Sequence, residues 1–70
     1  MNNVMAIALS GVNSATQRFE ASAKRVVSDK NADLAHELVT QKIAAVDFEA
    51  NLKVIKTADE MMKKTLDILA

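Results

Sequence analysis

The stretch SDKNAD, residues 28–33, decides how this chain folds, because it is the first clear interruption in an otherwise helix-forming sequence. The 70 residues include no proline and a single glycine, Gly11, so little else in the chain can end a helix. No alternating β-branched run or Asn-Gly pair indicates a strand. The serine, asparagine and aspartates of residues 28–33 compete with the helical backbone for hydrogen bonds and favour caps and tight turns. We therefore predict an all-α fold that bends here.

The bend divides the chain into a helix over about residues 3–28, a junction at about 29–31 and a second helix over about 32–69. Asn31 suits the left-handed conformation that ends a helix, and Asp33 favours the positive end of the next helix. The expected fold is a single helical domain over all 70 residues, an antiparallel hairpin resembling a coiled coil. The alternative is an unbroken rod of about 105 Å.

The first helix carries an apolar heptad pattern that is typical of a coiled-coil seam. Its members are Met5, Ala8, Val12, Ala15, Phe19, Ser22 and Val26. The helix is also crowded with alanine and serine, whose small side chains let neighbouring backbones approach closely. This composition favours dense helix packing over independent stability.

The second helix is apolar on two sides. One stripe holds Leu34, Leu38, Gln41, Ala45, Phe48, Leu52, Ile55, Asp59, Met62, Leu66 and Leu69. At 100° per residue a second stripe lies nearly opposite; it holds Ile43, Ala50, Val54, Thr57, Met61 and Ile68. Between them, one arc is small or uncharged (Ala44, Asn51, Ala58, Thr65). The other arc, which we call the charged edge, holds Lys42, Glu49, Lys53, Lys56, Glu60, Lys63 and Asp67. The charged exceptions are Glu37, Asp47, Asp59 and Lys64.

A helix that is apolar around most of its circumference belongs inside a larger assembly. We therefore expect the first helix to cover one stripe and a second subunit to cover the other, so that oligomerisation completes the hairpin. The predicted intrachain packing residues are Val12, Phe19, Val26, Leu38, Phe48, Leu52, Ile55, Met62 and Leu66. The predicted subunit-packing residues are Ile43, Ala50, Val54, Met61 and Ile68.

Composition excludes several classes of function. Nine basic and nine acidic residues give no electrostatic footprint for nucleic acid, and no apolar run approaches the roughly 20 residues of a membrane span. The chain has no cysteine and one histidine, so we expect no disulfide, metal or cofactor. Asp33, His36 and Glu37 share a helical face but are too few for a closed metal site. Without a cleft or a nucleophile with its base, we expect no enzymatic activity.

Residues 33–69 resemble the C-terminal segment of bacterial flagellar axial proteins, the rod and hook family. Their start, DLAHELV, matches the family's D-L-A-x-E-(L/M)-V pattern. FEAN at residues 48–51 matches its aromatic-E-A-N element, and TADEM at residues 57–61 matches T-x-D-x-M. Residues 9–23, LSGVNSATQRFEASA, are similar to the family's N-terminal segment. The large middle domain that usually separates the two segments is absent.

The resemblance implies two terminal helices that pack in the core of a tubular axle, with neighbouring subunits covering their remaining faces. It also implies export to the basal body without a cleaved signal, and MNNVMAIALSG at the N-terminus lacks the basic start of such a signal. The expected function is therefore that of a structural subunit whose partners are itself and flagellar axial proteins. The alternative is a cytoplasmic, small homo-oligomeric bundle that regulates flagellar export or assembly.

Overall fold

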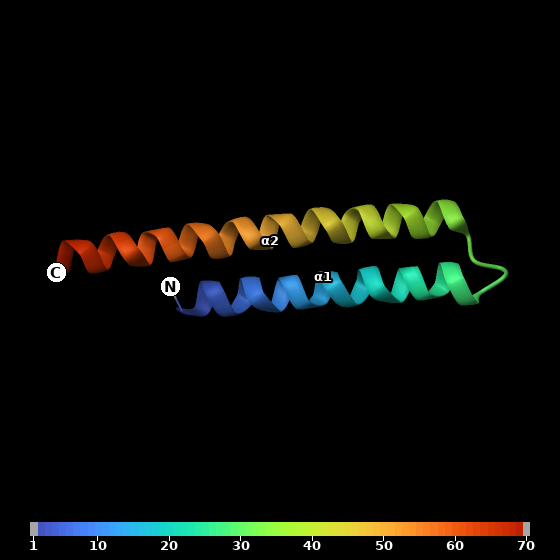
Figure 1. The fold of residues 1–70 in the computed structure, drawn as a ribbon, viewed down its shortest axis with the longest axis horizontal. Coiled ribbons are helices and arrows are strands. Elements are labelled where there is room, and N and C mark those ends of the chain that lie inside the picture. The colour runs from blue at the N-terminus through green and yellow to red at the C-terminus, as the bar shows by residue number, and fades with distance from the viewer. Residues whose placement is uncertain (1, 70) are drawn as a thin grey trace.

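The computed structural model describes residues 2–69, which form two α-helices, α1 (Asn2–Ser28) and α2 (Leu34–Leu69). The helices lie side by side and run antiparallel (Figure 1). The molecule measures 59 × 15 × 13 Å, so the chain doubles back and is not a single rod. The predicted all-α hairpin is confirmed.

The connection between the helices is held by two aspartates. Asp29 closes a tight turn, because its side-chain oxygen Oδ1 accepts a hydrogen bond of 2.9 Å from the backbone N–H of Asn31. Asp33 is the N-cap of α2, since its Oδ1 accepts a 3.2 Å bond from the backbone N–H of His36. This cap explains why α2 begins at Leu34, slightly later than expected.

The predicted left-handed conformation at Asn31 is wrong. Within residues 2–69, no residue other than glycine has a positive φ, and Gly11 has a negative φ. Two carbonyls at the end of α1 find other donors. The backbone N–H of Asp29 donates to the Arg25 carbonyl at 3.0 Å, and the Ser28 hydroxyl donates to the Lys24 carbonyl at 2.7 Å. The side-chain turn at Asp29 therefore makes a left-handed residue unnecessary.

The two helices touch along two columns of mostly small residues, which we call the central columns. They consist of Ala8, Ala15 and Ser22 in α1, and of Glu37, Ala44, Asn51 and Ala58 in α2. The four alanines are the buried hydrophobic residues of the part of the chain that the structure describes, and each is at most 5% exposed. Their seven-residue spacing keeps each column facing the partner helix along its length.

One point of the contact is especially close. A Cβ atom at Gly11 would overlap the side-chain amide of Asn51, so the absence of a side chain at Gly11 makes room for Asn51. The Asn51 Nδ2 also donates a 2.8 Å bond to the Asp47 carbonyl on its own helix. With a larger residue at position 11, the Asn51 amide would have to leave this position between the helices.

The centre of the contact thus differs from the expected one. The arc of α2 that faces α1 contains Ala44, Asn51 and Ala58, which the sequence places between the two apolar stripes. Small residues at the centre let the backbones approach, and the larger apolar side chains are then displaced to both flanks. Each stripe consequently borders the contact on one side.

α2 is nine residues longer than α1 and extends past it. Figure 1 shows its last turns, coloured orange to red, projecting beyond the N-terminal end of α1. The apolar side chains on this projection are among the most exposed of the molecule, with Leu66 at 61%, Ile68 at 82% and Leu69 at 78%. Within residues 2–69, these side chains remain largely uncovered.

Candidate interaction surfaces

The first candidate surface, face one, consists of the residues that lie one or four positions after each central-column residue. It includes an open groove between the helices, with a volume of about 580 Å³. The groove is lined by Thr16, Phe19, Ala45, Phe48 and Leu52, and two carboxylates, Glu20 and Glu49, also border it. Phe19 and Leu52 remain 43% and 44% exposed, so the groove presents apolar surface to its surroundings.

All nine predicted intrachain packing residues lie on face one, provided that the column of α2 is continued by seven residues from Ala58 to Thr65, which brings in Leu66. The nine are Val12, Phe19, Val26, Leu38, Phe48, Leu52, Ile55, Met62 and Leu66. All nine are half-buried or exposed in the single chain, and Leu66 lies on the projection of α2 beyond α1. Their assignment to intrachain packing stays a prediction. Asp59 is the one charged residue of face one within residues 2–69, and Lys63 pairs with it at 3.2 Å.

The second candidate surface, face two, lies on the other side of the central columns, one position before or three positions after each column residue. It contains all five predicted subunit-packing residues, namely Ile43, Ala50, Val54, Met61 and Ile68. A groove between Val4 of α1 and Val54 and Met61 of α2 opens on this side. Which partner covers face two stays a prediction.

Face two differs from face one in its charge. It carries the ion pair Arg18–Asp47, in which Arg18 Nη2 donates to Asp47 Oδ2 at 2.9 Å. Both side chains are partly exposed, so the pair contributes under about 1 kcal/mol to stability. The chain thus presents one face that is apolar along its centre and has carboxylates at its borders, and one face of mixed charge, and these suit different kinds of contact.

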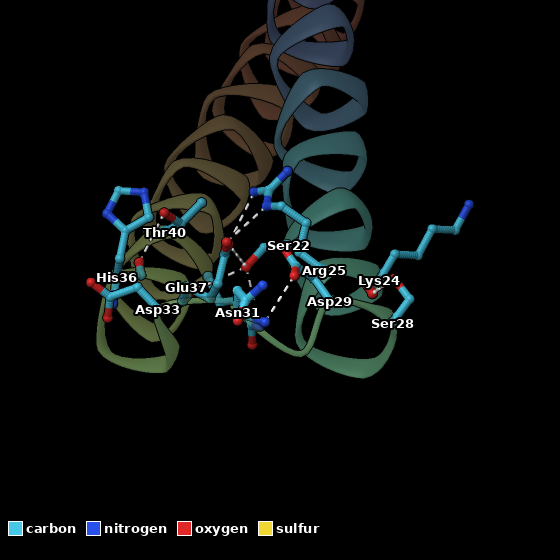
Figure 2. Close-up of polar contacts among 11 residues, drawn as sticks. Ser22, Lys24, Arg25, Ser28, Asp29, Asn31, Asp33, His36, Glu37 and Thr40 are labelled. Atoms are coloured by element: carbon cyan, nitrogen blue, oxygen red, sulfur yellow. Dashed lines mark hydrogen bonds and ion pairs between the residues drawn. The ribbon is translucent and has the colours of Figure 1, made fainter.

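A buried polar cluster links α1 to α2 near the connection (Figure 2). Ser22 is fully buried and Glu37 is 5% exposed. Ser22 Oγ donates a 2.8 Å bond to Glu37 Oε1, and Arg25 donates through Nε and Nη2 to the two carboxylate oxygens at 2.8 Å and 3.0 Å. Gln41 Nε2 donates to Ser22 Oγ at 3.3 Å. The carboxylate is therefore paired and hydrogen-bonded, as a buried charge must be.

The sequence did not identify this cluster. The available signals were that Glu37 falls outside the charged edge of α2 and shares the seven-residue spacing of Ala44, Asn51 and Ala58.

The structure also separates His36 from Glu37, two of the three residues that share a helical face near the start of α2. Figure 2 shows the His36 ring on the far side of α2 from the Arg25–Glu37 pair. Residues 2–69 contain no group of three side chains arranged to hold a metal ion.

We predict that acid weakens the hairpin through Glu37. The hydrogen bonds from Arg25 and then Ser22 lower the pKa of Glu37 below its usual 4.5, against the opposing effect of burial. The stabilisation from the ionised carboxylate is complete above about pH 4.5 and is lost as the pH falls through the lower folded-state pKa. Urea unfolding followed by circular dichroism between pH 7 and pH 3 should show this loss.

The matched variants are Glu37→Gln and Glu49→Gln, since Glu49 is an exposed carboxylate of the same helix. Glu37→Gln should flatten the acid side of the stability profile, and Glu49→Gln should follow the parent. An unchanged profile in Glu37→Gln would show that other carboxylates cause the acid sensitivity.

Comparison with known proteins adds one match. The family model described as flagellar basal body rod FlgEFG protein C-terminal matches residues 26–68, more than half of the chain. The match covers the end of α1, the connection and nearly all of α2. No curated protein and no solved structure matches the chain. Neither helix, over residues 2–69, has the length and apolar character needed to cross a membrane.

Proposed function

The chain belongs to the flagellar basal body rod FlgEFG protein C-terminal family, and from this we propose that it is a structural subunit of the flagellar axial assembly that associates through helix packing. The family is structural and not enzymatic. In this proposal the partners are further copies of the chain and other flagellar axial proteins. The proposed site of action is the basal body of the flagellum.

The observation that carries the proposal is the amount of surface that the hairpin leaves uncovered. The chain of 7.6 kDa has an accessible surface of 5559 Å². A compact monomer of this mass exposes about 4,300 Å². The excess of roughly 1,250 Å² is larger than the ~800 Å² that each partner buries in a standard interface. Much of it is apolar, because large hydrophobic residues are exposed along both faces and on the projection.

The two faces suit different contacts in such an assembly. We assign Ile43, Ala50, Val54, Met61 and Ile68 of face two to neighbouring subunits. The uncovered apolar side chains of face one, and those on the projecting end of α2 (Leu66, Ile68 and Leu69), would pack against further helices, because the hairpin leaves them exposed to water. Contacts made through two unlike faces run head to tail, and head-to-tail contacts produce a ring or a filament.

A closed oligomer is the second candidate. Face one is apolar along its centre, so two copies could cover each other's face one in an isologous four-helix arrangement. Such a bundle would act as a cytoplasmic interaction module in flagellar export or assembly. The two candidates differ in whether association stops at a fixed number of chains.

The proposed function is tested in the cell. We expect that deleting the gene impairs flagellar assembly or motility, and that a tagged copy co-purifies with basal bodies. Met61→Asp should exclude the tagged copy from basal bodies, because it places a charge on face two. Lys56→Ala, at an exposed position on the outer side of α2, should be tolerated. Recovery of all the protein in the cytoplasm, with normal flagella in the deletion strain, would contradict the axial role and favour the closed bundle.

A further inference from the structure

The central columns alone do not determine how α1 and α2 are aligned. Ala8 and Ala15 lie seven residues apart and Ala44 and Ala58 lie fourteen apart, so a slip of seven residues would again set small residues against small ones. Such a slip moves the helices by about 10.5 Å along their axes. The connection, residues 29–33, can extend to about 20 Å. The helix axes are ~8–10 Å apart, so the connection is long enough to join the helix ends after such a slip. Another feature must select the observed register.

Two departures from alanine in the α2 column distinguish the observed register from its neighbours. Glu37 is buried against Ser22, and its carboxylate is satisfied by Ser22 and Arg25. Asn51 is placed against Gly11, the one position of α1 without a Cβ atom. Each of these residues requires a particular partner, whereas each alanine accepts any small one.

A slip in one direction would place Glu37 opposite Ala15. Arg18 lies three positions after Ala15, as Arg25 lies three after Ser22, and could still reach the carboxylate. The hydroxyl bond would be lost, however, because alanine replaces serine. Asn51 would then meet Val4 in place of Gly11, and the space that its amide occupies would be filled. The Gly11–Asn51 pair therefore opposes this slip.

A slip in the other direction would place Glu37 opposite Asp29, beyond the last residue of α1. The residue three positions later is Ala32, so the Glu37 carboxylate would lose its arginine partner and face the carboxylate of Asp29. Asn51 would meet Arg18. This slip is opposed at both ends of the contact.

We propose that two contacts determine the register and so select one antiparallel alignment of the hairpin. The first joins Glu37 to Ser22 and Arg25, and the second places Asn51 against Gly11. The alignment sets how far α2 projects beyond α1. A slip by one heptad would lengthen or shorten the projection by about 10.5 Å, nearly two helical turns. It would also move Phe19 away from Phe48 and Leu52 and so disrupt the groove of face one. This inference stands independently of the proposed function.

The register can be measured with spin labels, since the chain contains no cysteine of its own. Cysteines at Asn13 and Glu60, both exposed, would carry the labels, one on each helix. Double electron–electron resonance, with labelled protein diluted in unlabelled protein, then reports the distance within one chain. The parent should show a single distance. Glu37→Ala with Asn51→Ala makes the α2 column uniform, and we expect further distance populations displaced by up to about 10 Å.

The control is Glu49→Ala, which removes an exposed carboxylate from the same helix and should keep the parental distance. A single parental distance in the Glu37→Ala, Asn51→Ala variant would overturn the proposal, because the connection alone would then select the register. A second measurement does not depend on that variant folding. Four Gly and Ser residues inserted after Asn31 of the parent should leave the distance unchanged, and a displaced distance there would equally overturn the proposal.

Discussion

Replacing Ala44 with leucine is expected to destabilise the hairpin by about 1–3 kcal/mol, the usual cost of overpacking a tight contact. Ala44 is 1% exposed and lies in the middle of the central column of α2. A leucine there cannot be accommodated without separating the helices, which would also break the Ser22–Glu37 and Gly11–Asn51 contacts. Urea or thermal unfolding followed by circular dichroism would measure the loss.

The matched control is Ala35→Leu, since Ala35 is exposed on the outer side of the same helix. The substitution is chemically identical, and leucine costs little in an exposed helical position. We expect the control to unfold with the parent. Equal unfolding of Ala44→Leu and Ala35→Leu would mean that the close contact of the central columns is not a source of stability.

Replacing Leu52 with aspartate is expected to abolish self-association while leaving the helices intact. Leu52 lines the groove of face one and is 44% exposed in the single chain, so an aspartate there can stay hydrated until a partner covers it. Burying the carboxylate in the interface without a cation costs about 3–5 kcal/mol, which corresponds to a weakening of more than about a hundredfold.

Sedimentation velocity over a wide concentration range would measure the association, and circular dichroism would confirm that Leu52→Asp stays helical. The parent should unfold at a temperature that rises with protein concentration, because association stabilises the folded chain. Lys56→Asp is the matched control, as it places the same side chain on the exposed outer edge. If Leu52→Asp and Lys56→Asp both associate like the parent, face one is not an interface.

The two experiments separate two sources of stability. Ala44→Leu acts on the contact within one hairpin, whereas Leu52→Asp acts on the contact between hairpins. A chain with so small a buried core depends on both, since four alanines bury little apolar surface. We therefore expect the parent to be weakly stable when dilute and clearly more stable when associated.

Local chemistry in the sequence was sufficient to predict the architecture. Serine, asparagine and aspartate at residues 28–33 indicated where the chain bends, and Asp33 caps α2 as its residue type suggests. Apolar residues on two sides of α2 indicated that the hairpin has more surface to bury than one helix can cover. The family followed from short motifs such as FEAN at residues 48–51, within the segment that the family model matches.

Only the tertiary structure showed which arc of α2 faces α1. Hydrophobicity alone favours a stripe containing Phe48 and Leu52, but the distance between two helices depends on side chains from both of them. Ala15 and Gly11 of α1 allow a close approach only if small residues oppose them, so Ala44 and Asn51 occupy the centre. The buried position of Glu37 likewise depends on Ser22 and Arg25, which precede it by fifteen and twelve residues. A pattern read along one helix cannot contain such information, because the fit belongs to the pair of helices.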